Sequence, residues 1–139
     1  MAWKTYSLDQ RAQKLVLDAK LRDPNSLNQS HKMRMAVTYG LERFWGEHLR
    51  LERKEPNKSQ YWKETWDEFV KVMEEAGVTI PNDKVKVNNT SDVKAMSERL
   101  WTELDIDKQR IAIAVLTQLC DCIVWWTQRY KGQVNLTDD

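Results

Sequence analysis

The segment from Ile106 to Lys131 limits most strongly what this 139-residue chain can fold into. Its apolar residues recur every three or four positions, which predicts one α-helix of about seven turns. Asp105 is a preferred N-cap residue just before it, and Gly132 is a preferred helix stop just after it. Additional apolar residues widen the apolar arc of this helix. We therefore expect it to lie at the centre of a bundle, covered on most sides.

The rest of the chain also favours helices. It has only 4 Gly and 3 Pro, and 31% of its residues are charged. We predict an all-α, single-domain bundle of about five helices over residues 1–139, with a flexible tail over 133–139. Capping signals and helix stops place four helices before the long one, and a polar connector over 78–90. These helices run from Ser7 to before Pro24, from Ser26 to about Lys54, from Ser59 to Gly77, and from Ser91 to Leu104.

Charge is divided unequally along the chain, although the formal net charge is only +1. Up to Gln60 there are 12 Lys and Arg against 7 Asp and Glu, and from Tyr61 onward there are 10 against 14. This division predicts one electropositive surface and one electronegative surface. The first would suit a polyanion and the second a basic partner.

The predicted helix from Ser26 to Lys54 carries a stripe of basic residues beside its apolar face. At 100° per residue, five side chains fall on one narrow flank of a straight helix: Lys32, Tyr39, Arg43, Arg50 and Lys54. Such a track, about 33 Å long, could follow a phosphate backbone. Arg11 and Lys14 of the first helix would add to its field if that helix packs alongside. The alternative is a solvated face balanced by Glu42, Glu47 and Glu52.

Tryptophan is unusually frequent, with 7 in the chain. Packing is the expected role of the tryptophans at or near apolar positions, which are Trp45, Trp62, Trp66, Trp101 and Trp126. Trp125 differs, because it falls on the polar side of the last predicted helix, beside Asp121 and Gln128. It is a candidate contact with another subunit or a platform for a base, with plain partial burial as the alternative.

Arg43 and His48 have the Arg, four residues, His spacing that is similar to the catalytic motif of the helical HEPN ribonucleases. Such enzymes would use these residues from a dimer to activate a ribose 2′-hydroxyl. On a regular helix, however, side chains five residues apart point about 140° from each other. His48 also falls on the apolar face, so we expect a buried histidine.

The remaining catalytic inventory is sparse. His31 is the only other histidine, and no glycine-rich phosphate loop or Glu-x-x-His pair is present. Cys120 and Cys122 lie two apart on a helix, which points their thiols apart and favours structural roles. We therefore expect no catalytic residue, no metal site and no cofactor. Without a signal-like N-terminus or a run of about 18 apolar residues, we expect a cytoplasmic protein that does not contact membranes.

Two segments carry a resemblance to a known family. Residues 112–132, AIAVLTQLCDCIVWWTQRYKG, and 7–20, SLDQRAQKLVLDAK, resemble the helical C-terminal region of the large subunit of type I-D CRISPR surveillance complexes. The separate small subunit of those Cascade complexes is similar to that region. The similarity spans most of the chain and rests on overall pattern and the distinctive terminal segment.

The resemblance implies a non-catalytic small subunit that lines a ribonucleoprotein. The implied partners are the other subunits of the effector complex, further copies of the chain, the guide RNA and the target DNA with its displaced strand. Base pairing would supply sequence specificity in such a complex. Two alternatives remain open: a HEPN-like ribonuclease that uses Arg43 and His48, and a helical adaptor that binds only protein.

Overall fold

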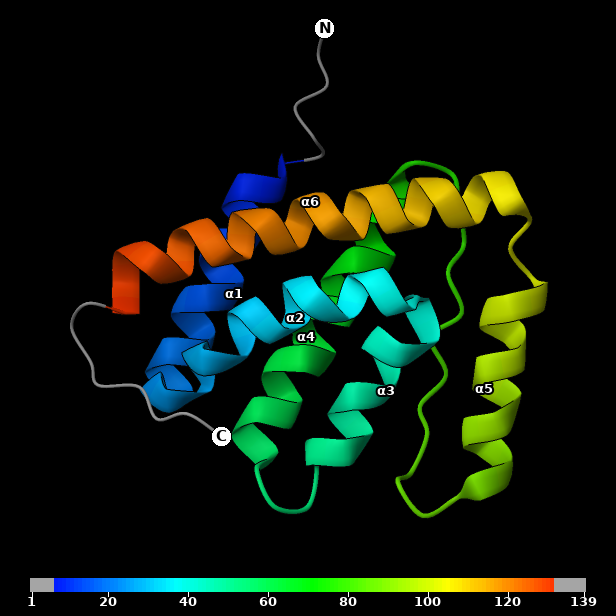
Figure 1. The fold of residues 1–139 in the computed structure, drawn as a ribbon, viewed down its shortest axis with the longest axis horizontal. Helices are drawn as coiled ribbons and strands as arrows, with labels where there is room; N and C mark the ends of the chain where they lie inside the picture. The colour runs from blue at the N-terminus through cyan, green and yellow to red at the C-terminus, as the bar shows by residue number, and fades with distance from the viewer. Residues whose placement is uncertain (1–6, 132–139) are drawn as a thin grey trace, which may run out of the picture.

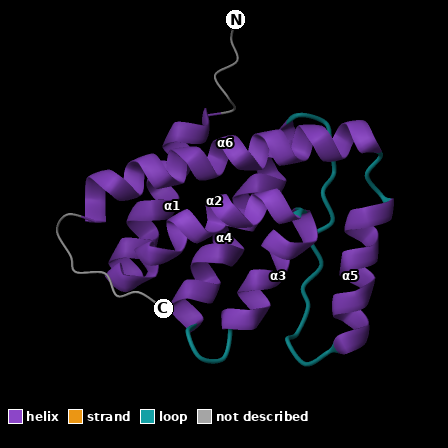
Figure 2. Ribbon diagram, in the orientation of Figure 1, coloured by secondary structure: helices purple, strands orange, loops and turns teal. Residues whose placement is uncertain are grey.

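The computed structural model describes residues 7–131, and these residues are helical apart from loops and turns (Figures 1 and 2). Six α-helices and two 3-10 helices, η2 and η3, are present, and this part of the chain contains no strand. The all-α prediction is confirmed, with six α-helices in place of about five. The predicted tail, 133–139, lies outside the described residues. In chain order the elements are α1 (Leu8–Arg22), η2 (Pro24–Gln29), α2 (Ser30–Ala36), η3 (Val37–Tyr39), α3 (Leu41–Leu51), α4 (Pro56–Glu75), α5 (Thr90–Thr102) and α6 (Ile106–Tyr130).

Helix α4 holds the centre of the core. It contacts α1, α3 and α6, and its inward face buries Trp62, Trp66 and Phe69 completely. The ring of Phe44 from α3 lies 4.9 Å from that of Trp62, centroid to centroid. Trp45 is buried as well. The packing role predicted for Trp45, Trp62 and Trp66 is therefore confirmed.

The prediction that the last helix lies at the centre of the bundle is wrong. Figure 1 shows α6 running along one side of the molecule, over α1 and α2. Ala112, Leu116, Leu119 and Ile123 are buried on its inward face, whereas Ile111 on the outward face is 49% exposed. By length and composition α6 is the one helix within residues 7–131 that could cross a membrane, a test that core helices also pass. Only 39% of its most apolar stretch is buried.

Two predicted helix ends match the structure. The side chain of Asp105 accepts a hydrogen bond of 2.8 Å from the N–H of Lys108, as an N-cap does. After α4, Gly77 takes a positive φ of 84° and donates its N–H to the carbonyl of Glu74 at 3.0 Å. Val78 donates to the carbonyl of Met73 at 2.9 Å, which completes a Schellman motif.

Two predicted helix starts are wrong, because proline begins the helical turns earlier. Pro56 opens α4, so Ser59 lies inside the helix, where its buried hydroxyl donates to the carbonyl of His48 at 2.6 Å. Pro24 likewise opens η2, which contains Ser26. The fixed φ of proline suits the first helical position, where a backbone N–H has no intrahelical partner.

The long second helix predicted from Ser26 to Lys54 is also wrong. The structure divides that stretch into η2, α2, η3 and α3, with the sharpest break at Gly40. Gly40 has φ 113° and ψ 163°, a backbone conformation that side chains with a Cβ rarely adopt. Its N–H still bonds to the carbonyl of Val37, closing the 3-10 turn before α3 begins. The break turns α3 away from the axis of α2.

Replacing Gly40 with alanine should lower the free energy of unfolding by about 1–3 kcal/mol, because the added Cβ must occupy a strained positive-φ conformation. Gly46, in the middle of α3, is the matched control: a Cβ there meets nothing within 4 Å. Gly46→Ala should raise stability by about 0.5–1 kcal/mol through helix propensity. Urea unfolding of both variants measures the difference. Equal changes in the free energy of unfolding for the two variants would contradict the positive-φ break at Gly40.

Helix α5 lies at the edge of the molecule and contacts α3 (Figure 1), and its Met96 and Leu100 are buried in the core. Trp101 at its end is 56% exposed, so its predicted place in the core is wrong. Trp126 on α6 is partly buried against the core, close to the prediction. The connector before α5 is not wholly polar in its packing, because Ile80 and Pro81 are buried.

Candidate nucleic-acid interface

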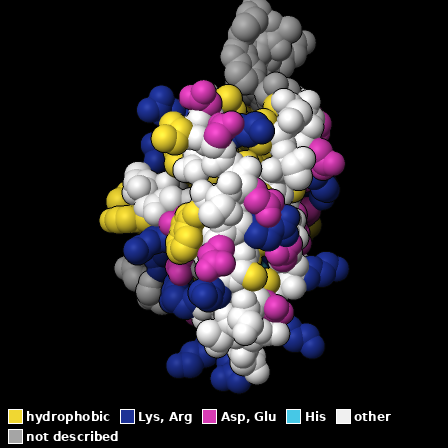
Figure 3. All heavy atoms as spheres, turned by 90° about the vertical axis from the view of Figure 1, so that its right-hand side faces the viewer, with side chains coloured by type: hydrophobic (Ala, Val, Ile, Leu, Met, Phe, Trp, Pro, Cys, Tyr) yellow, Lys and Arg dark blue, Asp and Glu magenta, His cyan; other side chains and the backbone are white. Residues whose placement is uncertain are grey.

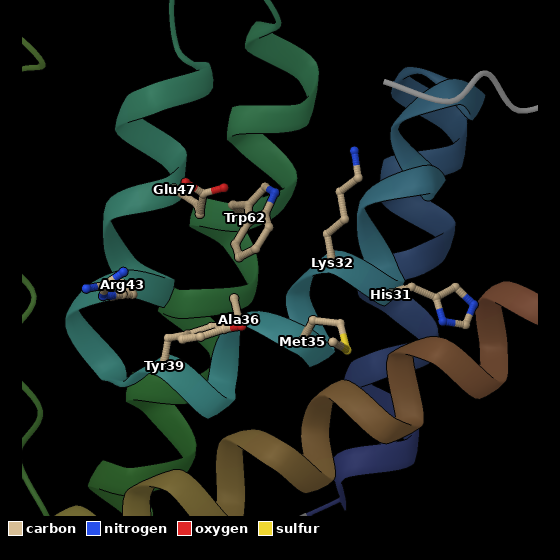
Figure 4. Close-up of a pocket in the computed structure, with 8 residues that line it drawn as sticks. All are labelled: His31, Lys32, Met35, Ala36, Tyr39, Arg43, Glu47 and Trp62. Carbon is tan, nitrogen blue, oxygen red and sulfur yellow. The ribbon is translucent and has the colours of Figure 1, made fainter.

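A pocket of about 420 Å³ opens between α2 and α3, on the side where Gly40 separates the two helices. The three elements around the break supply most of its wall, and one α4 side chain supplies the rest (Figure 4). We call this feature the α2–α3 groove. Its lining residues are His31, Lys32, Met35, Ala36, Tyr39, Arg43, Glu47 and Trp62.

The groove combines an apolar floor with polar groups at its edge. Figure 4 shows Tyr39, Ala36 and Met35 on one side of the cavity, and the Trp62 ring facing it from α4. Tyr39 is 64% exposed, which leaves much of its aromatic ring open to a ligand. The indole N–H of Trp62 donates to Gln29 at 2.9 Å, and this bond fixes the ring that closes the groove. Such a mixture is typical of small-molecule and nucleotide sites.

Three of the five residues in the predicted basic stripe meet at the α2–α3 groove. Lys32 comes from α2, Tyr39 from η3 and Arg43 from α3, and all three are exposed. Figure 4 shows Lys32 and Arg43 on opposite sides of the cavity. The stripe is therefore not a straight track on one helix, because the break at Gly40 folds it around a hollow.

Arg50 and Lys54 do not line the α2–α3 groove. Arg50 lies one turn beyond it on α3 and forms an ion pair with Glu47, with Nε 2.9 Å from Oε2. Lys54 follows the end of α3 and is exposed. Glu47 itself lines the groove, where its carboxylate partly offsets the two cations, and its pairing with Arg50 reduces that effect.

Arg11 and Lys14 also lie elsewhere. Arg11 of α1 forms ion pairs with Glu68 and Glu75 of α4, and Lys14 pairs with Asp18 at 2.7 Å. Both cations line a separate pocket between α1 and α4 that contains several carboxylates. The structure therefore does not join the first helix to the α2–α3 groove as one basic surface.

Ion pairs between helices neutralise part of the charge difference between the two halves of the sequence. Arg22 of α1 pairs with Glu64 of α4 at 2.8 Å, and Arg34 of α2 pairs with Asp121 of α6 at 2.6 Å. Basic residues of the first half thus hold acidic residues of the second half across helix contacts. Figure 3 shows the result on one face, where acidic and basic side chains are interspersed among hydrophobic ones. That face is not segregated by charge.

Arg43 and His48 do not share a site. Arg43 lines the α2–α3 groove, whereas His48 lines a different pocket with Ser59, Lys63 and Lys84. His48 is only 8% exposed, as predicted for a buried histidine. Its Nδ1 bonds to the carbonyl of Trp45, whose ring it also meets edge-on at 5.6 Å. The arrangement does not support joint action of the two residues within one chain.

Burial lowers the pKa of His48 below its usual range, although the hydrogen bond to Trp45 opposes the shift. A folded-state pKa below the unfolded value means that the unfolded chain binds the proton more tightly. Stability should therefore be full above the unfolded pKa of about 6.5 and decline as the pH falls below it. Urea unfolding between about pH 7 and pH 5 measures this dependence.

His48→Gln, which removes the titrating group, is the control for that measurement. In this variant the slope of unfolding free energy against pH should be smaller over the same window. A wild-type slope that the substitution leaves unchanged would contradict the assignment to His48.

Trp125 lies on α6, does not line the α2–α3 groove and is 48% exposed. The guanidinium of Arg129 lies 3.8 Å from the centroid of its ring, a cation–π contact. A shallow pocket of about 410 Å³ beside it is lined by Asp9, Asp121, Cys122, Trp125 and Trp126. The contact of Trp125 with a partner stays a prediction.

The cysteines divide between core and surface. Cys120 is buried, in agreement with its predicted structural role, and burial raises its pKa. Cys122 is half-buried, and desolvation together with Asp9 raises its pKa to about 11. Both thiols are therefore protonated at neutral pH and poor nucleophiles. Within residues 7–131 no three His, Cys, Asp or Glu side chains come together as a metal site would require.

Sequence reasoning found the cations of the α2–α3 groove but missed the apolar part of its wall. Trp62 comes from α4, so it could not be grouped with Lys32 and Arg43 on one straight helix, and Met35 and Ala36 were not singled out. The signal that would have found them is Gly40, which interrupts an otherwise helical pattern. Comparison with protein-family models, curated proteins and solved structures finds no match for this chain.

Proposed function

We propose that the α2–α3 groove binds single-stranded nucleic acid, and that the chain serves as a non-catalytic small subunit of a CRISPR surveillance complex. The observation that carries the first part is the meeting of Lys32, Tyr39 and Arg43 around one hollow. These residues come from three elements, and the backbone break at Gly40 brings them together.

The chemistry of the α2–α3 groove suits an unpaired strand. Lys32 and Arg43 supply positive charge on two sides, where phosphates of a passing backbone would lie. Tyr39 offers an exposed ring on which a base can stack, an interaction that tolerates any base. Phosphate contacts position a strand without reading its sequence. The groove would therefore hold nucleic acid by shape and charge and leave sequence recognition to the guide RNA.

The second part of the proposal rests on the resemblance of residues 7–20 and 112–132 to the type I-D CRISPR large subunit. In this role the chain would act in the cytoplasm beside the other subunits of the effector complex and further copies of itself. The nucleic acids that the α2–α3 groove could bind there would be the guide RNA and the target DNA, including the displaced strand.

A helical adaptor that binds only protein is the second candidate. The observation that favours it is the exposure of large apolar side chains on α5 and α6, among them Trp101 and Ile106. The ribonuclease alternative has no comparable support, because Arg43 and His48 line different pockets.

Affinity purification of the tagged chain from its native cells tests the proposal. We expect guide RNA and other effector subunits to co-purify with the wild type. The variant Lys32→Ala/Tyr39→Ala/Arg43→Ala should retain the protein partners with less nucleic acid bound. Protein partners without any RNA or DNA in the wild type would favour the adaptor and overturn the proposal.

A further inference from the structure

The outward side of α6 carries a row of exposed residues at helical-seam spacing. The steps of four and three between most of them place all six within an arc of about 60°. The row extends about 33 Å along the helix. We call it the α6 stripe, and its residues are Asp107, Ile111, Ala114, Gln118, Trp125 and Arg129.

The α6 stripe contains large apolar side chains that are exposed to solvent. Ile111 is 49% exposed and Trp125 is 48% exposed, while Ala114 between them leaves room for a close approach. The inward residues of α6 face α1 and α2, whereas all six residues of the α6 stripe are exposed. The start of α1 comes close to the α6 stripe at Trp125, which shares a pocket with Asp9.

The order of residues in the α6 stripe is complementary to itself when reversed. Counting equal distances from Gln118 pairs Ile111 with Trp125, and Asp107 with Arg129. An antiparallel second copy would therefore place an apolar residue opposite an apolar residue, and an acid opposite a base at each end. A parallel copy would instead oppose Asp107 to Asp107 and Arg129 to Arg129, which repel each other.

We propose that two copies of this chain associate through antiparallel α6 helices, with the twofold axis at Gln118. At the axis the two Gln118 amides can donate and accept hydrogen bonds, and a polar pair at such a position fixes the register. Trp125 of each copy covers Ile111 of the other. Arg129 already lies against the Trp125 ring, so its guanidinium is held at the end of the stripe, facing Asp107 of the second copy.

An isologous contact of this kind closes after two copies. It leaves the α2–α3 groove of each copy uncovered by the stripe, since none of the six residues lines that groove. The inference does not depend on nucleic-acid binding, and the measurements that test the two are separate.

Cysteine cross-linking tests the register directly. In a Cys122→Ser background, Gln118→Cys should form a disulfide-linked dimer under mild oxidation, because the twofold axis places the two introduced thiols together. Ala114→Cys, which also lies on the α6 stripe, is the control in the same background. In the antiparallel register its two copies lie about 12 Å apart along the axis, beyond the reach of a disulfide, whereas a parallel register would place them together.

Sedimentation equilibrium tests the contacts. Trp125→Ala should raise the dimer dissociation constant at least tenfold, as loss of a central aromatic contact does. Asp107→Arg and Arg129→Asp should each weaken the dimer, and the chain that carries both substitutions should recover most of the affinity.

Three outcomes would overturn this inference. One is a wild-type chain that stays monomeric up to about 100 µM, a concentration at which even weak specific pairs form. Another is a dimer that Trp125→Ala leaves unchanged. The third is equal cross-linking at positions 114 and 118, which an antiparallel twofold at Gln118 does not allow.

Discussion

Replacing Trp66 with alanine is expected to lower the free energy of unfolding by about 3–5 kcal/mol, the range for truncating a large buried aromatic residue. Trp66 lies in the middle of α4 and is completely buried. Its ring packs against Phe69, with centroids 5.2 Å apart, and lies 6.2 Å from Phe44 of α3. The truncation would therefore leave a cavity where two helices meet, and neighbouring rings can fill it only in part.

Trp101→Ala is the matched control for this prediction. The same atoms are removed, but from a side chain that is 56% exposed at the end of α5. We expect a loss of about 1 kcal/mol or less for Trp101→Ala, as for most surface substitutions. Guanidinium unfolding followed by circular dichroism measures both losses. Similar losses at the two positions would contradict the placement of α4 at the centre of the core.

Replacing Lys32, Tyr39 and Arg43 together with alanine is expected to weaken binding of single-stranded RNA by at least about a hundredfold. Stacking of a base on an aromatic side chain contributes about 1–3 kcal/mol. Two phosphate contacts from cations add about 1 kcal/mol or more each. All three residues are exposed at the α2–α3 groove, so the loss should come with little change in stability.

Fluorescence anisotropy with a labelled unstructured oligonucleotide measures this loss. Lys86→Ala/Lys94→Ala is the control. It also removes two positive charges, but from exposed positions outside the groove. The control should bind within about threefold of the wild type, because neither lysine lines the groove and salt screens their longer-range attraction. Equal weakening in both variants would mean that net charge, not the groove, attracts the nucleic acid.

The helix ends set by side-chain chemistry could be predicted from the sequence. Asp105 and Gly77 signal their local structure directly, since one side chain or one backbone conformation decides the outcome. The spacing of apolar residues did not indicate the break at Gly40. Met33 and Val37 before it and Phe44 after it are all buried, so the apolar spacing continues across the break as if the helix were straight.

The position of α6 could not be predicted from its apolar arc. A wide arc indicates that many faces of a helix avoid water, but it does not say whether the cover comes from the same chain or another. Ile111 and Ile113 belong to the arc and are exposed in the single chain. Trp101 was misplaced for a related reason, because a tryptophan at apolar spacing near a helix end can lie at the edge of the core.

The candidate site shows the same limit. The cations and the tyrosine of the α2–α3 groove follow from residue type, but their arrangement depends on the angle between two helices. That angle is set by the 3-10 turn and by the positive φ of Gly40. The prediction of a straight helix grouped Lys32, Tyr39 and Arg43, which do line one pocket, but in an incorrect arrangement.

The salt dependence of RNA affinity tests the proposed α2–α3 groove most directly, because it separates ionic contacts from stacking. Lys32→Ala/Arg43→Ala should lower the slope of log affinity against log salt concentration by about 1.4, which is about 0.7 for each cation that contacts a single strand. Tyr39→Ala should weaken binding at every salt concentration and leave the slope unchanged. A slope that stays at the wild-type value after both cations are removed would contradict the α2–α3 groove as the nucleic-acid interface.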